Sequence, residues 1–180
     1  LLAMQTLWVA PWLTQVGGQS SLSAATGLFW LNVAMLSTFW AWGTINPWLV
    51  RRGLRTEALI AWGLPLSFAM LALIIVLGPR AGAAHWALYC MSCTFVSLSQ
   101  PAVGMAFAQA VAGRALSAYN LVIFSGVFVV QWGIGLAIDA FLAAGLSTLG
   151  AYRAAMGVFL ACCVAGWGWF LAAPPHNRHP

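Results

Sequence analysis

Charged side chains are scarce in this chain of 180 residues. It contains no lysine, seven arginines and two carboxylates, and charged residues make up 5% of the sequence. Soluble domains carry about 25% charged residues, so this composition excludes an ordinary water-facing surface. The net charge of +5 does not indicate nucleic-acid binding, because the sequence has no basic face with interleaved aromatic residues. Anionic lipid head groups are the expected counter-charge.

Groups that could carry metal or acid–base chemistry are also few. The four cysteines lie inside apolar runs and offer no disulfide framework. Cys90 and Cys93 have the spacing of a metal-binding pair, but the nearest histidine is His85 and no further ligand is close, so packing is the favoured role. Glu57 and Asp139 are expected on opposite sides of a membrane. We therefore expect no metal site, no cofactor and no enzymatic activity.

Long apolar runs dominate what remains. Apolar residues make up 63% of the chain and the mean hydropathy is +0.92. Stretches this long and apolar are typical of transmembrane helices. The fold class is therefore predicted to be an all-α membrane protein with six transmembrane helices, followed by a polar C-terminal tail at residues 174–180. The expected spans are 1–16, 23–50, 56–78, 84–109, 115–139 and 149–173.

The arginines predict how these spans are oriented. A short basic loop, Arg51-Arg52-Gly53-Leu54-Arg55, lies between the second and third runs, and such loops mark the cytoplasmic side. Six alternating spans place Arg51, Arg52, Arg55, Arg114 and Arg178 on that side, against Arg80 and Arg153 on the other. We therefore expect both ends of the segment in the cytoplasm, and we expect Asp139 and Arg153 to pair across the last outer connection.

Aromatic residues give a second topological signal. Trp8 and Trp12 lie in the part of the first run where an outer-interface aromatic belt is expected.

The chain begins in apolar sequence with leucine, without a basic region or a cleavage site. We interpret it as a fragment of a longer protein.

Two motifs carry a resemblance to a known family. Gly43, Ile45, Arg51 and Arg52 match the loop motif between the second and third helices of major facilitator superfamily transporters, with Pro47, Trp48 and Val50 at the positions of its acid, first base and second glycine. The segment from Gly113 to Asn120, followed by Gln131-Trp132-Gly133-Ile134-Gly135 and Asp139, is similar to the fifth helix of many bacterial members. Over essentially its whole length, the chain resembles the C-terminal six-helix half of such a carrier.

The resemblance implies an alternating-access carrier in the bacterial cytoplasmic membrane. Two six-helix bundles would enclose a central cavity, and the missing N-terminal half would be the partner of this chain. The candidate solute-binding residues are the amides of the predicted spans: Gln5, Asn32, Gln100, Asn120 and Gln131. Gly43 and the arginines Arg51, Arg52, Arg55 and Arg114 would serve the inner gate and the topology, and Asp139 is the candidate coupling group.

Alternatives remain open at the level of single residues and of the whole chain. Membrane bundles commonly use buried amides for interhelical hydrogen bonds, so for each candidate a structural role is the alternative to solute binding. Gln100 is the best single candidate because Pro101 adjoins it and because Cys90, Cys93, Ser97 and Gly104 share its helix face. The alternative to a small-solute carrier is a six-span scaffold or assembly subunit that moves nothing across the lipid bilayer.

Overall fold

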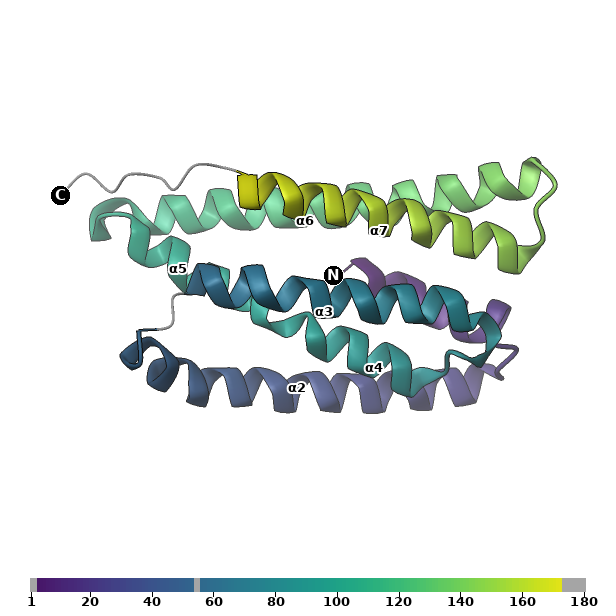
Figure 1. The fold of residues 1–180 in the computed structure, drawn as a ribbon, viewed down its shortest axis with the longest axis horizontal. Helices are drawn as coiled ribbons and strands as arrows, with labels where there is room; N and C mark the ends of the chain where they lie inside the picture. The colour runs from purple at the N-terminus through teal and green to yellow at the C-terminus, as the bar shows by residue number, and fades with distance from the viewer. Residues whose placement is uncertain (1–2, 54–55, 173–180) are drawn as a thin grey trace.

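The chain folds almost entirely into helices (Figure 1). The computed structural model describes residues 3–53 and 56–172, without the side chains at positions 50, 56 and 57, and it is about 91% helical. Within this described part, four helices are long and apolar enough to cross a membrane: α2 (Ser21–Arg51), α3 (Thr56–Leu77), α6 (Gln109–Ala143) and α7 (Thr148–Ala172). The prediction of an all-helical chain is confirmed, and four apolar helices are compatible with an integral membrane protein.

The first expected span is a short helix of irregular geometry. It consists of the π-helical segment η1 (Met4–Trp8), the three-residue α1 (Val9–Pro11) and a second π-helical segment, η2 (Trp12–Val16). Pro11 has no N–H to donate to the preceding turn, and the wider π-helical turns lie on both sides of it. These 13 residues would be about 20 Å long as a helix, which is shorter than the roughly 30 Å hydrocarbon core of a bilayer.

The fourth expected span, residues 84–109, is not one helix. It is divided into α4 (Ala83–Ser92), the 3-10 segment η4 (Thr94–Leu98) and α5 (Ser99–Ala106). Through this break four hydroxyl groups donate to the carbonyl oxygen three residues earlier, at 2.5 to 2.7 Å, and so satisfy carbonyl groups locally: Ser92, Thr94, Ser97 and Ser99. Pro101 lies in the first turn of α5, where a missing N–H removes no helical hydrogen bond. The break in this segment therefore lies before Gln100 and Pro101, at Cys93 and η4.

The helix ends also differ from the expected connections. The chain is extended at Phe107 and Ala108, so α6 begins at Gln109 and contains Arg114, which was expected in a loop. Two serines cap helices. The hydroxyl of Ser20 accepts the backbone N–H of Ser23 at 3.2 Å at the start of α2, and Ser147 does the same for Gly150 at the start of α7.

The helices pack side by side along the long axis of the molecule (Figure 1). α4 lies between α2 and α3, α7 packs on α3 and α6, and α5 packs on α6. The short first helix contacts α2, α6 and α7. The C-terminal end of α2 and the N-terminal end of α6 are at the same end of the bundle, which we call the arginine end because Arg51, Arg52 and Arg114 lie there.

An aromatic cluster forms the centre of the core near the opposite end. Trp12 and Trp86 are completely buried, and their rings meet edge to face with centroids 5.7 Å apart. The ring of Tyr152 packs on Trp12 in the same way at 6.2 Å. Trp12 therefore belongs to the core and not to an interfacial belt.

The surfaces of the long helices are mostly exposed and apolar. In the most apolar window of each of the four, only 11% to 17% of the residues are buried within the bundle. Trp62 on α3 and Trp169 on α7, for example, are 84% and 82% exposed. Such surfaces suit contact with lipid chains, in agreement with the membrane class.

Candidate functional site

Four uncharged polar side chains connect three helices through two hydrogen bonds. The amide nitrogen of Gln5 donates to Asn32 Oδ1 at 2.9 Å, which joins η1 to α2. The amide nitrogen of Gln131 donates to Thr6 Oγ1 at 2.7 Å, which joins α6 to η1. Gln5 and Thr6 are consecutive, and consecutive helical side chains point in directions about 100° apart, so one helix can reach a neighbour on each side. We call Asn32, Gln5, Thr6 and Gln131 the polar row.

The polar row lies toward the outside of the bundle. Asn32 and Thr6 are exposed, and Gln5 and Gln131 are half-buried. The core, by contrast, is apolar: among the described residues, the only buried polar side chains are Ser67 and Thr94. Hydrocarbon supplies no hydrogen-bonding partners, so amides exposed at membrane depth require water or another protein surface.

Bonding capacity remains in the polar row after its internal hydrogen bonds are made. The Asn32 amide also donates to the carbonyl oxygen of Leu28 at 2.8 Å. Gln5 and Gln131 use their amide nitrogens within the row, and the carbonyl oxygen of each side chain has two lone pairs that can accept further hydrogen bonds. The first helix is held close to α6 beside the row, because a Cβ added at Gly135 would lie 3.5 Å from the ring of Trp8. The arrangement can bind a solute through neutral hydrogen bonds, or it can simply hold three helices together.

Two predicted amides are not part of this arrangement. Gln100 is exposed on α5 and Asn120 is half-buried on α6, and neither has a hydrogen-bond partner in the described part of the chain. Their sequence neighbours make the contact instead, because the hydroxyl groups of Ser99 and Tyr119 hydrogen-bond to each other between α5 and α6. The structure thus brings together Gln5, Asn32 and Gln131, and it leaves Gln100 and Asn120 outside the row.

The predicted gating residues lie at the arginine end, apart from the polar row. Arg51 and Arg52 are exposed at the end of α2, and Arg114 is exposed in the second turn of α6. Gly43 is exposed on α2, with open space where a Cβ would stand. Arg55 lies outside the described residues.

Arg153 has different partners from those predicted. Its guanidinium donates to the carbonyl oxygen of Ile75 at 2.8 Å and to that of Val76 at 2.7 Å. These two carbonyls lie in the last turn of α3. The C-terminal end of a helix has unpaired carbonyl acceptors and partial negative charge. Asp139 is exposed on α6, and no ion pair joins it to Arg153 in the described structure. The predicted Asp139–Arg153 pair is therefore wrong, and a coupling role for Asp139 stays a prediction.

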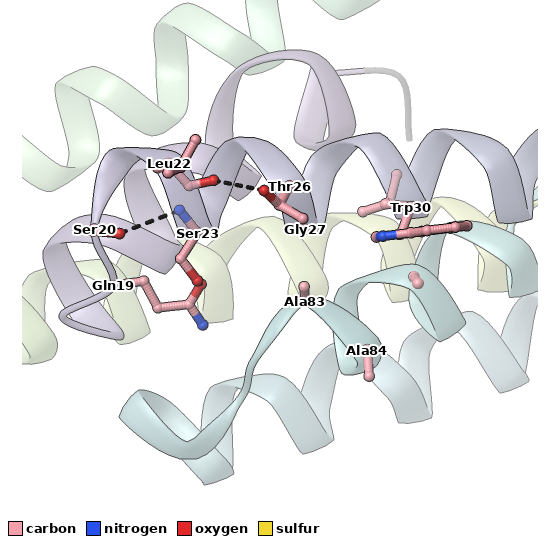
Figure 2. A pocket seen from close by; sticks show the side chains of 11 residues that line it. Gln19, Ser20, Leu22, Ser23, Thr26, Gly27, Trp30, Ala83 and Ala84 are labelled. Atoms are coloured by element: carbon pink, nitrogen blue, oxygen red, sulfur yellow. Dashed lines mark hydrogen bonds between the residues drawn. The ribbon is translucent and has the colours of Figure 1, made fainter.

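A separate groove opens between the starts of α2 and α4 (Figure 2). It has a volume of about 680 Å³, and Gly27, Ala83, Ala84 and Ala87 form small-residue walls, with Gln19, Ser20, Ser23, Thr26 and the ring of Trp30 around them. The Thr26 hydroxyl donates to the carbonyl of Leu22, and that of Ser23 to the Gln19 side chain. Because these polar groups mainly bond within their own segment, the polar row is the stronger candidate site.

The described part of the chain contains no cluster of side chains that could bind a metal ion. No group of three His, Cys, Asp or Glu side chains stands close enough there to hold a metal ion. Cys90 and Cys93 are buried free thiols, Cys163 is half-buried and Cys162 is exposed. The Cys90–Cys93 pair packs in the hydrophobic core.

Sequence reasoning missed several residues that connect helices. Thr6 directly follows Gln5 in the sequence, and this adjacency is the signal for a helix that bonds on two sides. The bond from Trp42 Nε1 to Thr94 Oγ1, 3.0 Å long, and the bond from the Tyr152 hydroxyl to Gln15 had no local signal. Partners 52 and 137 residues apart are not recognisable from spacing.

No family model, curated protein or solved structure matches this chain. What the protein does is therefore inferred from its fold and its side chains.

Proposed function

We propose that this chain is the C-terminal six-helix half of a secondary transporter of the major facilitator type, which moves a small solute across the membrane by alternating access. The observation that carries the proposal is the polar row, a set of hydrogen-bonded amides and a hydroxyl on the exposed side of an apolar bundle. Exposure of such groups to lipid is unfavourable. A water-filled path between this bundle and a second one gives them a favourable environment.

The proposed mechanism uses the row as the part of the solute site that this half supplies. In carriers of this kind, the binding site lies near the midplane, between two bundles that rock about it. Gln5 and Asn32 would face the solute from the first and second helices, and Gln131 from α6. Because the row carries no charge, it would orient the solute through hydrogen bonds, and coupling to an ion would depend on other groups.

Thiol labelling in the assembled protein tests whether the row faces water. Cys90, Cys93, Cys162 and Cys163 are first replaced by alanine, and Asn32→Cys or Gln131→Cys is then introduced. We expect both cysteines to react with a charged, membrane-impermeant methanethiosulfonate, because thiolates form only in contact with water. The matched control is Trp62→Cys on the apolar face of α3, which should stay unreactive.

Two outcomes separate the carrier from the six-span scaffold. If Asn32→Cys and Gln131→Cys are as unreactive as Trp62→Cys, the row is covered by protein or lipid and the carrier proposal fails.

Crosslinking through Gln100→Cys, in the same cysteine-free background, gives the second measurement. A crosslink to a second six-helix bundle, with uptake only when both bundles are present, supports the carrier. A crosslink between two copies of this chain, without uptake, supports the scaffold.

A further inference from the structure

The end of α2 presents two arginines and a tryptophan in a fixed arrangement. The guanidinium carbon of Arg52 lies 4.3 Å from the centroid of the Trp48 ring, which is the geometry of a cation–π contact. The backbone N–H of Arg52 bonds to the carbonyls of Trp48 and Leu49 at 3.1 and 3.0 Å, and Gly53 leaves the helix with a φ of 82°. Arg51 and Arg52 are both exposed, and Trp48 is 46% exposed.

These two arginines have no protein counter-charge among the described side chains. Asp139 is the one carboxylate whose side chain the structure describes, and it lies near the C-terminal end of α6, at the opposite end of the bundle (Figure 1). The side chain of Glu57 lies outside the described part of the chain. Arg153 shows the contrast, because its guanidinium donates to two carbonyl oxygens at the end of α3. Both Arg51 and Arg52 are exposed, so an external anion can reach them, and stacking of Arg52 on Trp48 leaves the N–H groups at the edge of its guanidinium free for bidentate bonding.

Exposed apolar surface directly beside the arginines identifies the kind of anion. Trp48 and Ile45, each 46% exposed, precede Arg52 by about one and about two turns of the same apolar helix. Aromatic residues at this position match the head-group level of a bilayer, with cations reaching the phosphates beyond it. A free phosphate ion would use the charges but would leave the apolar surface uncovered. A phospholipid covers both.

We propose that Arg51, Arg52 and Trp48 form a binding site for the head group of an anionic phospholipid. The phosphate accepts hydrogen bonds from the two guanidinium groups, and the upper part of the acyl chains packs against Trp48 and Ile45. This site is independent of the polar row. It would hold whether the chain transports a solute or acts as a scaffold.

Lipid retention by the purified chain tests this site. The protein is prepared in mild detergent with either phosphatidylglycerol or phosphatidylcholine, and retained lipid is counted by native mass spectrometry. We expect preferential retention of phosphatidylglycerol. Each arginine near an anionic surface contributes about fivefold in affinity, so Arg51→Gln with Arg52→Gln should weaken retention about 25-fold. Arg80→Gln, an exposed arginine at the opposite end, is the matched control and should retain the lipid.

Further variants separate the parts of the site. Trp48→Leu should weaken retention although the charges remain, and Arg52→Lys should weaken it because the planar stack is lost. The unfolding midpoint of each variant without added lipid shows whether it is folded. Equal retention of the two lipids, or unchanged retention in the double variant, would overturn the proposal. Displacement of phosphatidylglycerol by millimolar inorganic phosphate would also overturn it, because it would identify a site for a free anion.

Discussion

Arg153 is the residue whose replacement should affect stability most clearly. Its two hydrogen bonds to the carbonyls of Ile75 and Val76 hold the start of α7 against the end of α3, and hydrogen bonds from a charged donor contribute more than neutral ones. Arg153→Met should lower the free energy of unfolding in detergent by about 2 kcal/mol. Arg80→Met, which removes an exposed arginine at the same end, should change it by less than about 0.5 kcal/mol.

The same measurement distinguishes the observed partners of Arg153 from the predicted one. Asp139→Asn should leave the unfolding free energy within about 0.5 kcal/mol of the parent, because the carboxylate is exposed and forms no ion pair in the described structure. If Asp139→Asn destabilised the protein as much as Arg153→Met, an Asp139–Arg153 pair would have to exist in the membrane. The sequence placed both residues near one connection, but it held no sign that helix-terminal carbonyls would compete for the guanidinium.

At the scale of helix packing, a single glycine determines how closely α2 approaches α4. A Cβ added at Gly27 would lie 2.7 Å from the Cβ of Ala83, whereas one at Gly43, on the same helix, would meet nothing within 4 Å. Gly27→Ala should therefore destabilise the protein by about 1 to 3 kcal/mol, because the two helices must separate. Gly43→Ala should stabilise it by about 0.5 to 1 kcal/mol through helix propensity.

Thermal or denaturant unfolding of the two variants in the same detergent measures this difference. Opposite signs for the two substitutions are the expected result. Similar effects at both positions would show that α2 and α4 are not in close contact at Gly27. The pair is a controlled comparison, since each variant adds one methyl group to the same helix.

Helices with continuous apolar sequence were predictable, and irregular ones were not. The expected spans 23–50, 56–78 and 149–173 each coincide within two residues, in their described parts, with one long helix. Residues 84–109 are also apolar, but hydroxyl groups bond to local carbonyls and compete with the α-helical pattern there. Hydropathy measures burial in lipid, and it contains no information on that competition.

At the scale of the whole molecule, the arginines predict which end faces the cytoplasm. Gly113 is exposed at the arginine end, and Ala144 is exposed in the turn after α6 at the opposite end. In intact cells, with native cysteines removed, Gly113→Cys should resist an impermeant thiol reagent, whereas Ala144→Cys should react. The reverse labelling pattern would invert the orientation. Labelling of both positions after the cells are opened is the control for accessibility.

The candidate site was predictable in its residue types but not in its membership. Apolar spans make every amide conspicuous, so Gln5, Asn32 and Gln131 were identified from sequence alone. Their association depends on how the first helix lies between α2 and α6, which is a property of the tertiary structure. Gln100 was favoured by the residues on its own helix face, yet exposure on α5 leaves it without a partner in the described chain.

The broken fourth segment has a consequence for biosynthesis. α4 has ten residues and α5 has eight, so neither is long enough to cross a bilayer as an independent helix. The four long helices can each partition into lipid as they leave the ribosome. The segment from Ala83 to Ala106 depends instead on contacts to α2, α3 and α6, and α6 is synthesised after it. Its stable integration should therefore follow the emergence of α6, and an insertion factor that shelters it until then would improve the yield of folded protein.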